Sequence, residues 1–245
     1  MAVERQAAIE AYAAQMDGLK GWFHHIDLVV MELVDRAQAA LGIRGDILEI
    51  GCYEGKSAVL LGWFLRDGET LTVCDPFDDE SAAGADRDEV DALYPDVSMK
   101  AFLASFSRFH RFLPTVLACR STDGAVAELP PRFRMVHVDG SHRYDNVRAD
   151  IGTSRRLLVP NGVVVIDDFR YWVDVSCAVW RAVARDGLRP VAATEHKLYG
   201  TFGASPAAVS AVQGAIVDQL GVEASVHVLE GEPVVVVGEG AGPRP

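Results

Sequence analysis

Short apolar runs rich in valine, isoleucine and leucine recur along the middle of the chain, separated by segments with the spacing of amphipathic helices. Such runs are typical of strands buried on both faces of a parallel sheet. The pattern predicts strands at 46–51, 70–75, 115–119, 134–138 and 162–167, and helices at 55–66, 99–111, 123–129, 144–158 and 173–186. This alternation predicts an α/β fold with a doubly wound, mainly parallel seven-stranded sheet.

The two ends of the chain depart from this alternation. Two N-terminal helices are expected at 4–18 and 22–41. Beyond the last central helix the pattern predicts an antiparallel finish, with strands near 197–203, 224–229 and 233–237 and a helix at 206–220. No stretch has the composition of a linker, so we expect one domain over the whole chain.

Acidic residues directly follow two of the predicted strands. Asp139 ends the run 135–138, and Asp167 and Asp168 end the run 162–166. Ligands of open α/β sheets bind beyond the carboxyl ends of the strands, so these carboxylates are expected to face one crevice. Crowded carboxylates repel each other unless a cation joins them, and oxygen ligands favour Mg²⁺, with Mn²⁺ or Ca²⁺ as alternatives. The competing interpretation is that each aspartate caps a helix or turn.

His142 follows Asp139 by three residues, so a turn at the strand end could bring it to the same crevice. Imidazole titrates near neutrality and is suited to general-base chemistry. The alternative for His142 is a structural role, as a partner of Asp139 or a helix cap. His137 lies inside a strand and is expected to be a core residue with its hydrogen bonds satisfied. His24 and His25, beside Trp22 and Phe23, could edge the pocket or pack a helix, and Tyr144 and Asp145 are candidates for hydrogen bonds to the ligand.

A glycine-containing loop, residues 49–57, joins the first strand to its helix. Gly51 allows a sharp turn and Gly55 a close helix start. The spacing is neither that of a Walker phosphate loop nor that of a complete dinucleotide fingerprint. Asp75, at the end of the second strand, stands where an acidic residue can bind a ribose diol. The glycine loop and Asp75 together favour a nucleoside ligand without phosphates. The alternative interpretation is structural: the glycines form an ordinary tight turn, and Asp75 only precedes a turn at Pro76.

Composition and charge limit the kinds of function and partner that the chain can have. The chain has 245 residues, of which 49% are hydrophobic, so it can bury a sizeable core. Its formal charge of −12 argues against binding to nucleic acid or to anionic membranes. No apolar run approaches the roughly 20 residues of a membrane span, and the start lacks a signal-peptide pattern. The four cysteines have no metal-binding spacing and are expected to be reduced core residues of a cytoplasmic protein, for which we expect a homodimer.

The glycine loop, Asp75 and the stretch 138–168 together resemble the class I S-adenosylmethionine-dependent methyltransferases. The resemblance covers about 45–190 and implies a Rossmann-like methyltransferase fold. It also implies that the loop holds the methionine part of the cofactor, that Asp75 holds the ribose, and that 119–121 lies near the adenine. The cofactor-binding residues that it implies are Glu49, Gly51, Cys52, Tyr53, Gly55, Lys56, Ser57, Asp75, Arg120, Ser121 and Asp139.

Within that class the chain is similar to the metal-dependent sugar O-methyltransferases of the macrocin and mycinamicin type. They have an acidic pair at the second metal position and a histidine three residues after the first aspartate. This implies Asp139, Asp167 and Asp168 as ligands of Mg²⁺, and His142 as the general base for a sugar or oligosaccharide hydroxyl. The short, arginine- and alanine-rich chain suggests, as a specific acceptor, a mannoside of a methylmannose polysaccharide.

Two other functions stay open at this point. A catechol-type O-methyltransferase would act on a phenolic acceptor, but that branch has Asp-Asn at 167–168 and Lys at 142, where this chain has Asp-Asp and His. A non-catalytic cofactor-binding module would not need the carboxylate cluster. In the enzyme interpretation the domain divides into N-terminal helices in 1–44, a cofactor-binding core in 45–190, a lid or substrate insertion in 76–112, the rest of the sheet in 191–237 and a disordered tail in 238–245.

Overall fold

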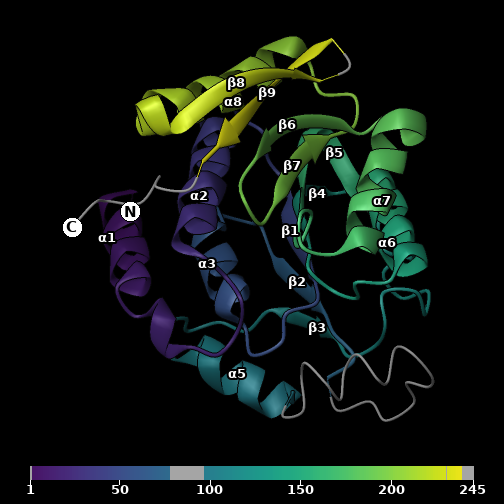
Figure 1. The fold of residues 1–245 in the computed structure, drawn as a ribbon. Coiled ribbons are helices and arrows are strands. Elements are labelled where there is room, and N and C mark those ends of the chain that lie inside the picture. Colours follow the sequence, from purple (N-terminus) through teal and green to yellow (C-terminus); the bar gives the residue numbers. More distant parts are fainter. Residues whose placement is uncertain (1, 78–96, 230, 239–245) are drawn as a thin grey trace.

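The computed structural model describes residues 2–77, 97–229 and 231–238, which form an α/β fold around one mixed sheet (Figure 1). Nine strands are present in these residues, in the spatial order β3-β2-β1-β4-β5-β7-β6-β9-β8. Their bounds are β1 Asp46–Ile50, β2 Leu71–Cys74, β3 Thr115–Leu117, β4 Phe133–Val138, β5 Leu158–Ile166, β6 Arg189–Ala193, β7 Leu198–Thr201, β8 Ala224–Leu229 and β9 Glu232–Val237.

The sheet reverses its winding between β1 and β4. Strands β1, β2 and β3 pair in parallel on one side, and β4 and β5 continue in parallel on the other. Strand β7 is antiparallel to both β5 and β6, and β8 is antiparallel to β9. A ligand crevice is expected where the winding reverses, beyond the carboxyl ends of β1 and β4.

Helices cover both faces of the sheet (Figure 1). One face packs against α1, α2, α3, α5 and α8, and the other against α6 and α7. The helices are α1 Ala2–Ala13, α2 His25–Ala40, α3 Lys56–Phe64, α5 Met99–Ser107, α6 Tyr144–Leu157, α7 Val173–Arg181 and α8 Pro206–Leu220. Because strand side chains alternate between faces, Ile47 belongs to the first core, whereas Leu48 and Ile50 belong to the second. Glu49 is therefore on the face of the N-terminal helices.

The predicted fold class is confirmed, with local differences. The helix predicted at 123–129 is wrong, because this segment forms turns between Gly124, at φ +95°, and Pro130. Strand β6 was not predicted, since its sequence Arg-Pro-Val-Ala-Ala contains few strand-forming residues. The sheet extends beyond the expected seven strands because β9 adds to β6 and β8 adds to β9.

Some predictions fall partly outside the described residues. This applies to 78–96 of the expected lid or substrate insertion and to 239–245 of the expected tail. The four cysteines are free thiols, but only Cys52 and Cys74 are buried, and Cys177 is exposed rather than in the core. Among the described helices none is long and apolar enough to cross a bilayer.

A buried arginine joins the amino end of β4 to the helical layer. The Arg134 guanidinium is inaccessible to solvent and lies 2.9 Å from Asp35 Oδ1 and 3.1 Å from Glu69 Oε2. It also donates to Gln38 Oε1 at 2.8 Å and to the Phe64 carbonyl oxygen at 2.8 Å. The planar guanidinium can serve all four partners at once, so it fixes α2 and the end of α3 against the sheet.

Replacing Arg134 by methionine should strongly destabilise the fold. The substitution leaves Asp35 and Glu69 with less compensation in a buried position, so we expect the free energy of unfolding to fall by about 3–5 kcal/mol. Arg148→Met is the control, because the side chains of Arg148 and its partner Asp145 on α6 are both exposed and such a pair contributes at most about 1 kcal/mol. Chemical denaturation of both variants measures the difference, and equal losses would contradict this role for Arg134.

Candidate active site

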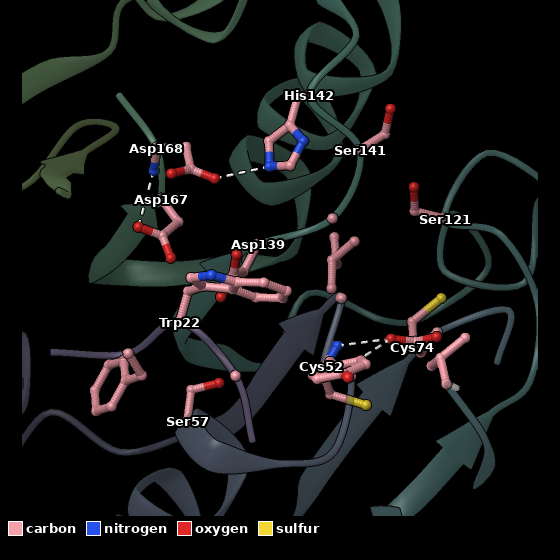
Figure 2. Close-up of a pocket in the computed structure, with 18 of the residues that line it drawn as sticks. Trp22, Cys52, Ser57, Cys74, Ser121, Asp139, Ser141, His142, Asp167 and Asp168 are labelled. Atoms are coloured by element: carbon pink, nitrogen blue, oxygen red, sulfur yellow. Dashed lines mark hydrogen bonds and ion pairs between the residues drawn. The ribbon is translucent and has the colours of Figure 1, made fainter. Parts of the chain in front are cut away.

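A cavity of about 520 Å³ opens at the carboxyl edge of the sheet, where its winding reverses. Figure 2 shows its two ends: Cys52, Cys74 and Ser121 lie at one, and Asp167, Asp168 and His142 at the other. The cavity therefore joins the glycine loop to the carboxylates that follow β4 and β5.

Gly51 brings two strand ends into contact. Its φ is +81°, and a Cβ there would lie 1.9 Å from the Asp139 carbonyl oxygen. The Gly51 amide donates to Cys74 O at 2.8 Å, and the Asp139 amide donates to Ile50 O at 2.7 Å. Glycine is required at this position because any side chain would separate the loop after β1 from the loop after β4.

Asp75 organises the glycine loop from the end of β2. Its Oδ2 accepts the Cys52 and Tyr53 amides at 2.8 and 3.0 Å, and its Oδ1 accepts the Phe77 amide at 2.8 Å. Burial raises the pKa of Asp75, while these three amides act in the opposite direction. The carboxylate lines the cavity and shapes the loop around it.

A buried polar chain runs behind the cavity, between the sheet and α3. Glu49 and His137 are cross-strand neighbours on β1 and β4, and His137 Nδ1 lies 2.9 Å from Glu49 Oε1. The Ser57 hydroxyl donates to the same Glu49 oxygen at 2.5 Å. His137 Nε2 lies 3.1 Å from the ammonium nitrogen of Lys197. Because that ammonium can only donate, Nε2 accepts, and Nδ1 carries the proton that is donated to Glu49.

Lys197 connects this chain to the carboxylates at the cavity. It stands immediately before β7, is inaccessible to solvent, and its Nζ forms an ion pair with Asp167 Oδ2. Burial would lower the pKa of Lys197, but Asp167, Asp139 and Asp27 raise it above its usual value. Burial would likewise raise the pKa of Asp167, yet Lys197 lowers it below its usual range. Burial and then Asp167 raise the pKa of Asp139 well above its ordinary value.

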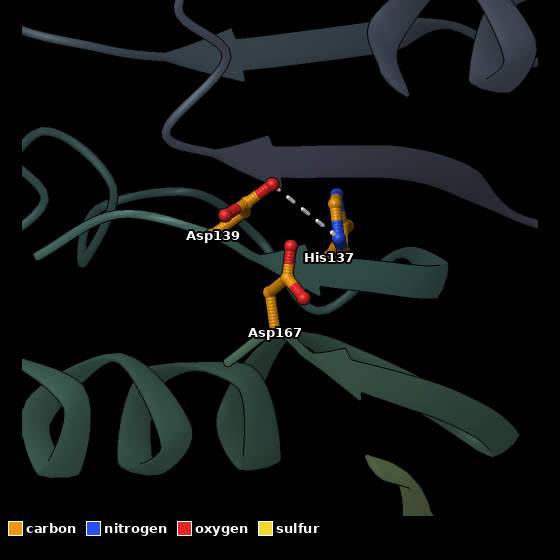
Figure 3. A group of neighbouring side chains, drawn as sticks. All are labelled: His137, Asp139 and Asp167. Atoms are coloured by element: carbon orange, nitrogen blue, oxygen red, sulfur yellow. Dashed lines mark ion pairs between the residues drawn. The ribbon is translucent and has the colours of Figure 1, made fainter. Parts of the chain in front are cut away.

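The residues that could hold a metal ion differ from the predicted set. His137, Asp139 and Asp167 offer ligand atoms within 4.8 Å of one another (Figure 3). However, both nitrogens of His137 already have partners, and Asp167 Oδ2 is paired with Lys197. Asp168, the third predicted ligand, binds His142 instead. A divalent ion would have to displace an ammonium group, so this arrangement does not fit a metal without rearrangement.

His142 and Asp168 form a close pair at the other end of the cavity. His142 Nε2 lies 2.7 Å from Asp168 Oδ2, and the imidazole stacks on Trp172 with ring centroids 4.6 Å apart. Asp168 has a positive φ of 56°, and its amide donates to Asp167 Oδ1 at 2.8 Å. Helices α6 and α7 have Arg143 and Trp172 at their N-caps, so the aspartates do not cap these helices. Asp167 does cap the turn that follows β5, because its Oδ1 accepts the Asp168 amide.

Flat rings form much of the remaining wall near His142. The imidazoles of His24 and His196 stack with centroids 3.6 Å apart, and Tyr171 stacks on the other side of His196 at 5.3 Å. Trp22 lies 5.8 Å from Tyr53, centroid to centroid. These rings line the same cavity as the glycine loop. They can exclude water and pack against a ring-shaped acceptor.

Most of the predicted site residues line this cavity. They are Gly51, Cys52, Tyr53, Lys56, Ser57, Asp75, Arg120, Ser121, Asp139, His142, Asp167 and Asp168. Glu49 lies behind the wall in its contacts with Ser57 and His137, and Gly55 begins α3 against Phe102. Of the suggested edge residues, Trp22, Phe23 and His24 line the cavity, whereas His25, Tyr144 and Asp145 do not.

Residues from two further segments belong to the site but were not predicted from the sequence. Tyr171 and Trp172 follow β5, and His196 and Lys197 belong to the turn before β7. In the sequence, the aromatic pair after Asp167–Asp168 could have signalled a wall of the pocket. His196 and Lys197 gave no such signal, because their position depends on how β7 pairs with β5.

The sequence around this site matches a known protein family. Residues 48–169, about half of the chain, match the protein family described as a methyltransferase domain. The matched range contains Gly51, Asp75, Asp139 and Asp168. Together with the fold, this match identifies the protein as a class I S-adenosylmethionine-dependent methyltransferase. None of the curated proteins matches the chain.

Several solved structures share the fold at low identity. The O-methyltransferase NovP is 17% identical, with a TM-score of 0.55 over 72% of this chain and 80% of NovP. Cofactor-bound Rv0187 from MTB is 16% identical, with a TM-score of 0.51 over 82% of this chain and 91% of that protein. CalS11, a TDP-rhamnose 3′-O-methyltransferase of calicheamicin biosynthesis, is 14% identical, with a TM-score of 0.50 over 82% of this chain and 95% of CalS11.

Asp150 should make the stability of the domain depend on pH. Burial raises the pKa of this α6 residue to about 7, opposed by a hydrogen bond with Ser121 at the cavity. Because this folded-state pKa exceeds the unfolded value of about 3.9, the stabilisation is complete below that value and is lost as the pH rises through about 7. We expect the free energy of unfolding to fall on the order of 2–3 kcal/mol between about pH 5 and 8.

Asp150→Asn should remove this part of the pH dependence, since the amide stays neutral. Denaturant unfolding of the variant and its parent at both pH values measures it. Asp145→Asn is the control, because Asp145 lies on the same helix with a largely exposed side chain. An unchanged pH slope in Asp150→Asn would show that Asp150 is not the group responsible.

Proposed function

We propose that this methyltransferase is an O-methyltransferase whose acceptor is a hydroxyl of a sugar or oligosaccharide. The observation that carries the proposal is the His142–Asp168 pair, which lies in the same cavity as the glycine loop. A donor site and a general base are the two parts that methylation of a hydroxyl requires. Nucleophiles such as thiols do not need a base as strongly, so the pair favours an oxygen acceptor.

In the proposed reaction the acceptor oxygen attacks the methyl carbon while the hydroxyl gives its proton to His142. Because Nε2 faces the Asp168 carboxylate, the proton goes to Nδ1, which is enclosed in this structure and has to become exposed when the acceptor binds. The carbon–sulfur bond breaks, and the sulfonium becomes the neutral thioether of S-adenosylhomocysteine. The Asp168 carboxylate stabilises the imidazolium that forms, because the two groups are in hydrogen-bond contact. Lining the cavity with rings keeps water from competing as an acceptor.

The cofactor is proposed to lie along the glycine loop with its sulfonium toward Asp139. In this placement Asp75 has one remaining acceptor position on Oδ1 for the ribose diol, since that oxygen receives only the Phe77 amide among the contacts described. Arg120 and Ser121 lie at the adenine end, and Lys56 and Ser57 at the methionine end. Glu49 contributes indirectly by fixing Ser57 and His137.

A sugar acceptor suits the mixture of groups around His142. Asp139, Ser141 and Asn146 can exchange hydrogen bonds with several hydroxyls, and rings such as Trp172 can pack against the C–H face of a pyranose. A mannoside of a methylmannose polysaccharide remains the specific acceptor suggested by the sequence. The homodimer and the cytoplasmic location likewise stay predictions, whereas the predicted Mg²⁺ ion does not fit the contacts that His137 and Asp167 make.

A phenolic acceptor is the second candidate, and one observation favours it. The stacks His24–His196–Tyr171 and His142–Trp172 line the cavity with aromatic rings, against which a planar aromatic acceptor can pack. Parallel assays with nucleotide sugars, mannosides and catechols decide between the two classes. Turnover of catechols alone would replace the sugar proposal.

His142→Ala should lower the rate of methyl transfer while leaving cofactor binding intact. Loss of a general base typically costs roughly 10²–10⁴-fold in the chemical step. The measurement is single-turnover transfer with cofactor and acceptor saturating. His227→Ala is the matched control, since His227 lies on the exposed strand β8. A rate for His142→Ala equal to that of the parent would remove His142 from the chemistry.

Asp75→Asn should weaken cofactor binding through the ribose. We expect the loss of affinity for S-adenosylhomocysteine to be about 1–3 kcal/mol, the scale of a disrupted buried polar contact. Calorimetry with S-adenosylhomocysteine and with its 2′,3′-dideoxy analogue separates this contact from the loop-shaping role of Asp75. The parent should prefer the diol, and the variant should lose that preference. If both proteins discriminate equally, Asp75 only organises the loop.

A further inference from the structure

A lysine ammonium already stands among the carboxylates where the sequence predicts a metal ion. Lys197 Nζ pairs with Asp167 Oδ2, lies 3.1 Å from His137 Nε2, and stands 5.3 Å from the centre of the Phe23 ring. His137 and Asp167 are two of the three residues that could otherwise hold a metal (Figure 3). Two of the three residues that could hold a metal therefore already contact a cation.

The position of Lys197 is fixed by its turn. The Thr194 amide donates to Lys197 O at 2.9 Å, and the Lys197 amide donates to Thr194 Oγ1 at 2.9 Å. That hydroxyl in turn donates to Asp27 Oδ1 on α2 at 2.6 Å. Lys197 has no solvent exposure, so its ammonium cannot swing into water without opening the turn. The pairing of β7 with β5 adds to this, because Ile166 pairs with Leu198, and Asp167 and Lys197 lie just beyond this last pair.

We propose that the Lys197 ammonium is the resident cation of this site, and that the methyltransferase works without a divalent metal. The effect of Lys197 on catalysis rests on the proposed O-methyl transfer, whereas the position of its ammonium group among the carboxylates does not. A divalent ion bound by His137, Asp139 and Asp167 would face a positive charge at a few ångströms, in a buried setting where such repulsion is strong. It would also need His137 Nε2, which accepts from Lys197.

Lys197 acts on the reaction as a positioning residue. It holds Asp167 by Oδ2, Asp167 accepts the Asp168 amide on Oδ1 at 2.8 Å, and Asp168 holds His142 at 2.7 Å. The cation thus orients the base through two adjacent aspartates. In this arrangement the acceptor proton is removed by the His142–Asp168 pair, and no Lewis acid has to polarise the hydroxyl.

The test begins with the unmodified protein after dialysis against EDTA. Electron paramagnetic resonance counts the Mn²⁺ that the protein removes from solution, and methyl transfer is assayed with EDTA present and with added Mg²⁺. We expect no stoichiometric Mn²⁺ binding and the same turnover in both assays. Stoichiometric binding of Mn²⁺, or turnover that EDTA abolishes and Mg²⁺ restores, would overturn the proposal.

Lys197→Ala provides the converse test. Removing the ammonium frees His137, Asp139 and Asp167, so the variant should gain a Mn²⁺ site that the parent lacks. Lys197→Arg keeps the charge and should not gain one, and neither should Lys100→Ala, which removes an exposed lysine of α5. We expect turnover of Lys197→Ala in EDTA to fall on the order of 10²-fold, the cost of misplacing a catalytic group. A folded Lys197→Ala variant that binds no Mn²⁺ would contradict the proposal that the ammonium group occupies the place of a metal ion.

Two controls keep the outcomes distinct. If Lys197→Ala fails to fold by circular dichroism, Mn²⁺ binding and EDTA resistance of the unmodified protein decide the proposal alone. Calorimetry with S-adenosylhomocysteine in EDTA reports the cofactor site independently of the acceptor. If the cofactor binds but no acceptor is methylated, the O-methylation proposal fails, while the Mn²⁺ measurements still decide the identity of the cation.

Discussion

The ion pair between Lys197 and Asp167 is the contact on which the arrangement of the active site depends. It joins the end of β5 to the turn before β7, and both residues are almost completely buried. Removing either partner would leave an uncompensated charge in a region of low polarity, which is far more costly than losing a surface pair. The pair therefore constrains where the sheet can end and which side chains can gather at that end.

From this ion pair, two chains of hydrogen bonds run along the edge of the sheet. One path leads through His137 and Glu49 to Ser57 at the start of α3, and so reaches the glycine loop. The other leads through the Asp168 amide to His142. A single buried cation thus relates the donor end of the cavity to the base at its other end. This favours a rigid site in which both reactants are held before the reaction begins.

The sequence predicted the parts of the site that depend on local pattern. Gly51, Asp75, Asp139 and Asp167 could be found because each directly follows an apolar strand, and strand ends of a doubly wound sheet share one edge. The cavity includes all four. The sequence also showed that crowded carboxylates need a cation, which the structure supplies as an ammonium group.

Lys197 could not be assigned from the sequence because its place depends on long-range pairing. The weak strand β6 gave no sign of the hairpin that returns β7 beside β5, and the antiparallel register of that pair is what brings residue 197 to residue 167. His196 enters the cavity wall by the same turn. Strand order is set by tertiary packing, so a local pattern does not reveal it.

A cavity with aromatic walls and a buried monovalent cation is consistent with the charge changes of methyl transfer. A sulfonium donor and a developing alkoxide carry opposite charges, and both charges disappear as the methyl group moves. Such a reaction gains from a site that excludes water, because less solvation has to be lost on the way to the transition state. The Trp172 ring, on which His142 stacks, can contribute to that exclusion when an acceptor covers it. With Lys197 already balancing Asp167, the charge that still has to be moved is the acceptor proton, which the His142–Asp168 pair is proposed to receive.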